Sequence, residues 1–525
     1  MLVNFHEIIT SVYVDSDAAM AGVLGQAIGH IAAGSYVSLG NHPWYEEWLF
    51  LLATRGAPSH RQLWEIAPAL WSLSGLAIFA WTARAVFGSL SAGLCGAALL
   101  CVGAFGRFCF LAINWHSLSL VHTILVAGAS VWLIGRIGEI SWRPIILLAL
   151  GLGVVSALPT ASDSLFPFWA FAPLVAASVA VAWRAPSRER VRLATFVAIV
   201  LTVAATGGVI VASSMRASGV TARELPITLV AVGGIGHNIA LLGESYAYLG
   251  GGRLTAPRLN AQSMLAPASA SLVLIALIAG LAQLVRVACR SLLRRQMTAQ
   301  ALFYVAFWGS SLLTTSVVFI CTDAPRDALS GRYLLGGYAA IAALLPLSAA
   351  RSARARLAVT AGVCAFALIA TYQLSRRPFD VIKPPDEQLR FPGPSTAAAL
   401  ARFAQRQHVT YGYGGYWDAE ELTWSMNFSV QIRPVRVCPG SRTYALCYPQ
   451  LGMVSSWYTP KPRTRSLLVV DTVGTSYNGI LARDVTLGKP LAARRLDVIT
   501  VYVYPYDIAS RLATPRCRFT WAHPC

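Results

Sequence analysis

The feature that most constrains this chain is a series of apolar segments separated by short loops that carry arginine. Each segment is long enough to cross a hydrocarbon core of ~30 Å as a helix. Because 56% of the 525 residues are hydrophobic and only 12% are charged, the sequence predicts a polytopic α-helical membrane protein. We expect about ten or eleven transmembrane helices. The apolar segments run over 67–87, 91–113, 117–134, 143–160, 164–183, 193–213, 268–286, 301–321, 333–350 and 357–374. A further apolar segment, 225–242, contains Gly233, Gly234 and Gly236, and we interpret it as a re-entrant or interfacial piece interrupted by these glycines.

The arginines in the short loops predict the orientation. All four arginine-rich loops fall on one side when the spans are counted through, and positive loops favour the cytoplasm. We therefore interpret the net charge of +19 as topogenic and do not expect nucleic-acid binding. The arginines in question are Arg136, Arg143, Arg184, Arg188, Arg190, Arg192, Arg286, Arg290, Arg294, Arg295, Arg351, Arg354 and Arg356.

This orientation predicts three domains. Residues 1–66 form a first extracytoplasmic loop with juxtamembrane helices, 67–375 form a transmembrane helical module, and 376–525 form a soluble extracytoplasmic domain. The alanine- and arginine-rich composition is typical of a bacterium, so we expect a multi-pass protein of the bacterial inner (plasma) membrane. The fourteen residues before Asp15 are too few and too polar for a span. Either the N-terminus is exported without its own helix or, as we favour, a first span precedes Met1.

The composition changes after about residue 380, where a proline-rich linker begins. A helix is expected over 396–407, and strands over Ser466–Val470 and Val498–Val503, which predicts an α/β domain. Four cysteines in this outer domain favour two disulfides, and short loops favour local pairing, although zinc binding is an alternative. The expected pairs are Cys438 with Cys447 and Cys517 with Cys525.

Acidic residues gather in the first loop. Asp15 and Asp17 stand one residue apart, and a carboxylate beside the membrane can act as general base toward a hydroxyl. The alternative is that Asp17 caps the following helix and Asp15 is solvated. The pair is also able to hold a divalent metal, although we do not favour a metal cofactor.

The stretch NHPWYEEW follows in the same loop. Asn41 and Pro43 can start a helix that places two glutamates in its first turns, which is a purely structural explanation. The functional interpretation is that the aromatic and acidic side chains bind a sugar or lipid. Its candidate residues are His42, Trp44, Glu46 and Glu47.

Other candidates belong to the remaining outer turns. His116 and Asp163 lie in two separate turns, and Arg326, Arg332 and Tyr333 lie in or after the loop 322–332. An arginine at the bilayer edge can bind a phosphate head group through two hydrogen bonds. A snorkelling arginine that anchors a helix end explains Arg332 equally well. The sequence contains no phosphate-binding P-loop, dinucleotide fingerprint, zinc-protease motif or nucleophile elbow.

The order YVDSDAA, then NHPWYEEWLFLLATRGAPSHRQLWEIAPAL, then GRYLLGGYAAIAALLP resembles the GT-C superfamily of membrane glycosyltransferases. The resemblance is to the type that includes protein O-mannosyltransferases and the lipid A aminoarabinose transferase. It covers roughly 13–88 and 326–350, and it departs from the common motif where Trp44 follows His42-Pro43. The acidic stretch YGYGGYWDAEELTW resembles more weakly the C-terminal domains of some bacterial members.

The resemblance implies a GT-C-like fold and a glycosyltransferase that uses a polyprenyl-phosphate-linked sugar. The acceptor would be a glycan, lipid or protein of the cell envelope, and membrane lipids would surround the enzyme. Asp15 would be the general base of an inverting displacement, and Arg332, with Arg326, would neutralise the departing phosphate. Two other classes are open: a polyprenyl-linked lipid or sugar flippase or transporter, and a non-catalytic protein that binds envelope glycans.

Overall fold

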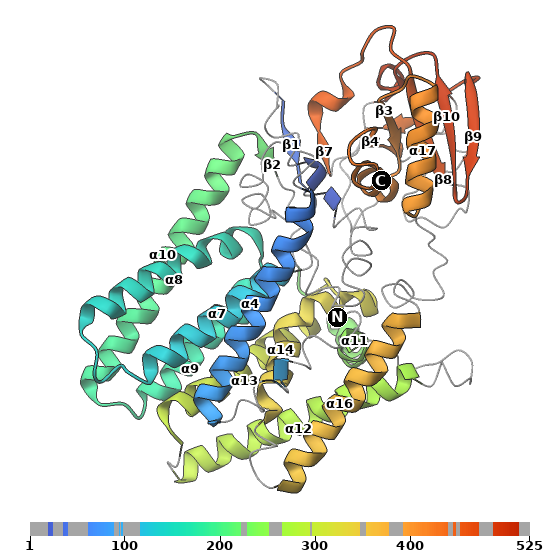
Figure 1. Cartoon of the computed structure of the whole chain (residues 1–525). Coiled ribbons are helices and arrows are strands. Elements are labelled where there is room, and N and C mark those ends of the chain that lie inside the picture. The colour runs from blue at the N-terminus through green and yellow to red at the C-terminus, as the bar shows by residue number, and fades with distance from the viewer. Residues whose placement is uncertain are drawn as a thin grey trace. The chain divides into compact units, whose positions relative to one another are not determined.

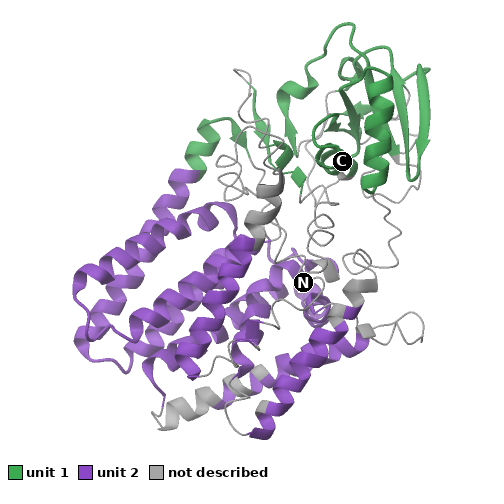
Figure 2. Ribbon diagram, in the orientation of Figure 1, with its two compact units in different colours: residues 1–67, 212–225, 383–525 green, residues 68–211, 226–382 purple. Residues whose placement is uncertain are grey.

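The computed structural model divides the chain into two compact units, and each is described by itself (Figure 2). Unit 1 contains residues 1–67, 212–225 and 383–525, and unit 2 contains residues 68–211 and 226–382. The structure describes residues 19–20, 22–24, 35–39, 61–88, 94, 96–97, 116–221, 228–250, 265–294, 297–346, 353–376, 392–438, 445–447, 452–471 and 487–513.

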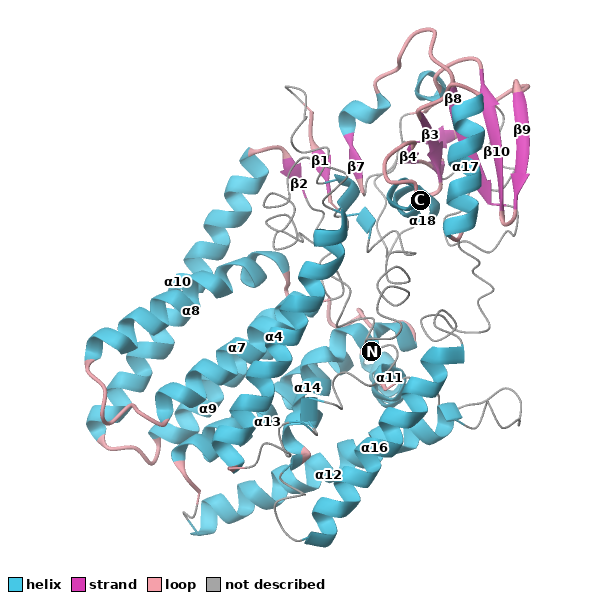
Figure 3. Cartoon of the chain, in the orientation of Figure 1, coloured by secondary structure: helices cyan, strands magenta, loops and turns pink. Residues whose placement is uncertain are grey.

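The named elements that lie wholly or mostly in unit 2 are all helices (Figures 1 and 3). Its central helix, α13 (Ala299–Cys321), packs along α9 (Ala172–Ala182) and α14 (Leu335–Leu344). The other elements are α4 (Arg61–Phe87), α7 (Ser117–Ile134), α8 (Trp142–Ser162), η3 (Pro167–Phe171), α10 (Ser187–Ala217), α11 (Val232–Leu249), α12 (Leu265–Arg294), η4 (Ala328–Leu334) and α16 (Ala353–Arg376). Helices α4 and α10 each extend a few residues beyond the boundaries of this unit.

Five helices among the described residues are long and apolar enough to cross a membrane. They are Leu70–Phe87, Ser117–Ile134, Trp142–Ser162, Ser187–Ala217 and Ala299–Cys321, and each overlaps a span expected from the sequence. Shorter apolar helices cover Pro167–Ala182 and Pro267–Ala279. The expectation of a helical membrane protein is confirmed at this level.

The expectation for 225–242 is wrong in one respect. Gly233, Gly234 and Gly236 do not interrupt a helix, because all three lie inside α11. Apart from the adjoining residues and backbone of α11 itself, no described atom lies within 4 Å of a Cβ built on Gly233 or Gly236. The Asn238 side-chain amide donates to the carbonyls of Ile320 (3.0 Å) and Thr322 (2.9 Å), so α11 is tied to the end of α13.

The C-terminal part of unit 1 is built around a five-stranded sheet of order β4-β3-β8-β10-β9. Strand β3 (Tyr411–Gly414) is parallel to β4 (Gln431–Pro434) and β8 (Ser466–Asp471), whereas β10 (Ile499–Tyr504) is antiparallel to β8 and to β9 (Ala492–Leu496). The expected helix at 396–407 is confirmed as α17 (Pro394–Arg406), and the two expected strands are confirmed as β8 and β10. The remaining elements are α18 (Tyr416–Ser425), β5 (Arg436–Val437), β6 (Leu446–Cys447), η5 (Ser455–Tyr458) and η7 (Ile508–Arg511).

The sheet is buried on both faces at its central strand, β8. Along β8, Leu467 and Val469 join the cluster that contains α17 and α18, while Leu468 and Val470 join the opposite cluster. This alternation follows from the two-residue period of a strand, and burial on both faces explains the continuous apolar run. Gly412 in β3 is required by packing, because a Cβ there would lie 2.2 Å from the Leu467 side chain.

Three distant segments of unit 1 also form a small sheet of order β2-β1-β7. These strands are β1 (Val37–Ser38), β2 (Val220–Thr221) and β7 (Met453–Val454). Ahead of β1, the helical residues 19–20 and 22–24 pack onto α18, where a Cβ on Gly22 would lie 2.1 Å from the Trp424 ring. A stretch of the first loop therefore belongs to the same compact unit as the C-terminal sheet.

Candidate functional site

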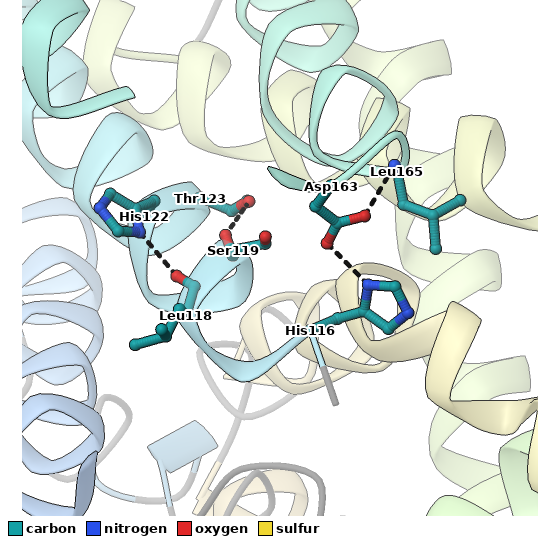
Figure 4. A network of polar contacts seen from close by, with 7 residues as sticks. All are labelled: His116, Leu118, Ser119, His122, Thr123, Asp163 and Leu165. Atoms are coloured by element: carbon teal, nitrogen blue, oxygen red, sulfur yellow. Dashed lines mark hydrogen bonds and ion pairs between the residues drawn. The ribbon is translucent and has the colours of Figure 1, made fainter. Parts of the chain in front are cut away.

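A histidine and an aspartate from two separate turns meet in unit 2 (Figure 4). His116 immediately precedes α7 and Asp163 immediately follows α8, the next helix. Because these two packed helices are joined by a short loop at one end, the start of α7 and the end of α8 lie at the same opposite end and bring the two side chains together. The His116 Nδ1–H group donates to Asp163 Oδ2 over 2.7 Å, and the residues are only 3% and 2% exposed.

The carboxylate of Asp163 is satisfied on both oxygens. Oδ1 accepts from the backbone N–H of Leu165 over 2.9 Å, and the Ser119 side chain also bonds to the carboxylate. Burial alone would raise the pKa of Asp163, but the charge of His116 and these hydrogen bonds together hold the pKa below its ordinary value of 3.8. Asp163 is thus a buried anion that holds the imidazole ring in place.

The hydrogen bond to Asp163 determines which nitrogen of the His116 ring can act on a ligand. Because Nδ1 carries the donated proton, Nε2 carries the lone pair of the neutral ring and the second proton of the charged ring. A carboxylate behind a histidine is the arrangement by which proteins orient a general acid or base. His116 also has φ of 63°, a left-handed backbone conformation that is uncommon for residues other than glycine.

Aromatic rings enclose the imidazole on two sides. The rings of Trp169 in η3 and Tyr333 in η4 meet the His116 ring edge-to-face, at centroid distances of 5.6 and 5.7 Å. The indole N–H of Trp169 is buried and has no hydrogen-bond acceptor among the described residues. The Arg332 guanidinium lies over the Tyr333 ring at 4.8 Å and donates to its hydroxyl over 3.0 Å. The Arg332 guanidinium therefore lies against the Tyr333 ring, which in turn contacts the His116 ring.

A glycine pair allows this packing. The sequence RYLLGGY continues from Arg332 and Tyr333 into α14, where Gly336 and Gly337 face two aromatic side chains. A Cβ on Gly336 would lie 2.6 Å from the Trp169 ring, and one on Gly337 would lie 2.1 Å from the Tyr246 hydroxyl. The close approach of Trp169 to α14 therefore requires glycine at position 336.

Four of the candidates chosen from the sequence come together here: His116, Asp163, Arg332 and Tyr333. Arg326 is exposed, and its backbone N–H donates to Ser330 Oγ at the start of η4. The disulfide between Cys438 and Cys447 is confirmed. The remaining candidates lie outside the described residues: Asp15, Asp17, His42, Trp44, Glu46, Glu47, Cys517 and Cys525.

Three residues of the neighbourhood were not predicted. Ser119 and Trp169 contact the histidine–aspartate pair, and His122 lies one turn further along α7, where its Nδ1–H donates to the Leu118 carbonyl over 2.7 Å. An ionisable residue inside an apolar span is a signal that the sequence offered for His122. Within the described residues, no group of three histidine, cysteine or acidic side chains is arranged to hold a metal ion.

The helices and the sheet define the class of the protein: it is a mostly helical membrane protein whose C-terminal region contains a sheet. Comparison with protein-family models and with curated proteins finds no match for this chain.

Proposed function

We propose that this chain is a membrane glycosyltransferase that moves a sugar from a polyprenyl-phosphate-linked donor to an acceptor of the cell envelope. One observation carries the proposal. Residues that the sequence nominated for the outer surface, from three separate segments, gather as His116, Asp163 and the Arg332–Tyr333 pair. Together they offer a cation for a phosphate, an oriented imidazole and aromatic walls suited to a sugar or lipid.

The direction of the helices supports a site on the outer face. His116 lies at the start of α7 and Asp163 at the end of α8, whereas Arg136 and Arg143 flank the loop at the opposite ends of these helices. Since arginine-rich loops favour the cytoplasm, the pair would face outside. We extend the proposal to a bacterial inner-membrane protein of about ten or eleven GT-C-like spans with an extracytoplasmic C-terminal domain.

The reaction would be a single displacement at the anomeric carbon. The bond from this carbon to the phosphate oxygen breaks while the acceptor oxygen attacks from the opposite face, so the configuration inverts. Asp15, which lies outside the described residues, would take the acceptor proton. Arg332 would neutralise the departing phosphate, and the indole N–H of Trp169 and Nε2 of His116 would act as hydrogen-bonding groups beside it. If Asp15 is not the base, His116 is the alternative, because Asp163 holds its ring for proton transfer.

Transfer from a labelled polyprenyl-phosphate sugar by the purified protein tests the proposal. Arg332→Gln should lower the rate by about 10²–10³-fold, the usual effect of losing one group that stabilises developing charge. Arg354→Gln, which removes an exposed arginine from the start of α16, should leave the rate unchanged. If the donor crosses the membrane of reconstituted vesicles and no sugar is transferred, the protein is a flippase. Glycan binding with neither activity would indicate a non-catalytic binding protein.

A further inference from the structure

The end of unit 2 opposite the histidine–aspartate pair carries a concentrated positive charge. Two segments are joined there: 135–143, which is the loop after α7 with the first two residues of α8, and 183–192, which is the turn after α9 with the first residues of α10. They contain six arginines against two glutamates, Glu139 and Glu189. The Arg192 NH1 group joins the segments by donating to the Ile137 carbonyl over 2.5 Å.

The buried Arg192 side chain still has one hydrogen-bond donor that no described residue occupies. Its side chain is 2% exposed, and its Nε–H has no acceptor among the described residues. The guanidinium lies 5.7 Å from the ring centre of Trp142, the first residue of α8. A buried, charged N–H of this kind calls for an acceptor beyond the described residues, and an anion supplies both the acceptor and the opposite charge.

The start of α8 favours an anion at the same place. Its N-cap residue, Ser141, makes no side-chain capping bond, and no acidic residue occupies the first turn. Within the described residues, therefore, neither a capping side chain nor an acid in the first turn offsets the positive end of the helix, where the backbone N–H groups of Trp142 and Arg143 lie. Arg136 adds a further cation nearby in the loop and lies 5.2 Å from the ring centre of Trp132.

An apolar surface continues from these charges along α8. Ile146, Leu147, Leu150 and Val154 follow one another on this helix, and their exposed fractions are 37, 69, 40 and 62%. A free phosphate would use only the charges, whereas a phospholipid uses the charges and the apolar surface together. We infer that Arg192, Arg136, Arg143 and the start of α8 form a binding site for the head group of an anionic phospholipid.

The test uses the full chain in detergent, with native mass spectrometry to measure binding of phosphatidylglycerol and of phosphatidylcholine with the same acyl chains. Phosphatidylglycerol should bind more tightly. Because one arginine near the membrane surface contributes about fivefold in affinity, the double variant Arg136→Gln/Arg143→Gln should weaken phosphatidylglycerol binding about 25-fold. The matched control is Arg216→Gln, an exposed arginine in the last turn of α10, which should change nothing.

Equal binding of the two lipids by the unmodified chain would overturn the inference, whatever the variants do. An equal loss with Arg216→Gln would also overturn it, since the effect would then be one of net charge. Displacement of phosphatidylglycerol by millimolar glycerol phosphate would show that the site takes a free phosphate and not a lipid. Resistance to that competitor is the expected result.

Discussion

Glu420 offers a direct test of how a buried ionisable group affects the stability of unit 1. It lies on α18 with 0% exposure, and neither carboxylate oxygen has a hydrogen-bond partner among the described residues. Burial raises the pKa of this carboxyl well above its ordinary value of 4.5. The unfolded chain releases the Glu420 proton above pH 4.5, so folding at neutral pH requires the carboxyl to take a proton up again.

The sign and size of the effect follow from proton linkage. Between pH 4.5 and the raised pKa, the folded state binds one proton more than the unfolded state, so the free energy of unfolding falls as pH rises. Each pH unit costs about 1.4 kcal/mol, which limits the penalty at pH 7 to about 3.4 kcal/mol, reached if the folded carboxyl stays protonated. Glu420→Gln keeps the shape and removes the ionisation. It should therefore stabilise the protein at pH 7 and make no difference at pH 4 and below.

Thermal unfolding of the full chain in detergent, followed by tryptophan fluorescence from pH 4 to pH 8, measures this difference. A unit of this size gains about 2–4 °C per kcal/mol, so the unfolding temperature should rise by several degrees at pH 7. Asp497→Asn, which changes an exposed carboxyl of the same unit, should give no pH-dependent gain. A difference between Glu420→Gln and the parent that stays constant across this pH range would refute the reasoning, as would a loss of stability at pH 7.

Other outcomes follow from the described contacts. Asp163→Asn should destabilise unit 2 by about 3–5 kcal/mol at pH 7, the usual cost of breaking a buried pair. Because the pKa of Asp163 is held below 3.8, that difference should be constant well above pH 3.8 and shrink as pH falls from 3.8 to the lowered pKa, which a pH series of unfolding temperatures would detect. Replacing Cys438 and Cys447 with serine opens a short loop and should cost about 2–3 kcal/mol in denaturant unfolding, and reductant should destabilise this variant less than it destabilises the parent. Gly22→Ala should lower the unfolding temperature, since its Cβ would clash with Trp424, and Trp424→Leu in the same chain should recover part of the loss.

Most helices could be predicted because the membrane imposes their length and composition. The expected span at 117–134 coincides with α7, since Ser117–Ile134 is mostly apolar with no acidic residue, lysine or arginine, and Gly135 and Arg136 follow it. The charge pattern also placed His116 and Asp163 on one side. Their hydrogen bond was not predictable, because it depends on how α7 packs against α8 and on the left-handed backbone of His116, which no local pattern signals.

Packing between elements also explains the features of both units that could not be predicted from the sequence. In the sequence, Trp169 looks like an aromatic residue that faces lipid, and only the structure shows that its ring packs against Gly336. A glycine pair in an apolar helix is a recognised sign of close packing, but it does not say which side chain packs there. Strand β3 has glycine at two of its four positions, which disfavours a strand by propensity, but Gly412 is needed beside Leu467. The two-residue strands β1, β2 and β7 are too short to show any period.

Because the backbone of His116 is left-handed, a comparison of its alanine and glycine variants can separate a packing role of the side chain from a chemical one. Its left-handed conformation costs about 1–2 kcal/mol for any residue with a Cβ, a cost that glycine avoids. His116→Ala and His116→Gly both remove the ring and leave Asp163 without its partner, but only the glycine variant relieves the strain. Glycine also loses more backbone entropy on folding than alanine, so His116→Gly should unfold at a higher temperature than His116→Ala by an amount equivalent to about 0.5–1 kcal/mol. If the ring acts in sugar transfer, both variants should lose activity equally despite this difference in stability. Activity that instead rises with stability, with His116→Gly near the parent, would reduce His116 to a packing residue.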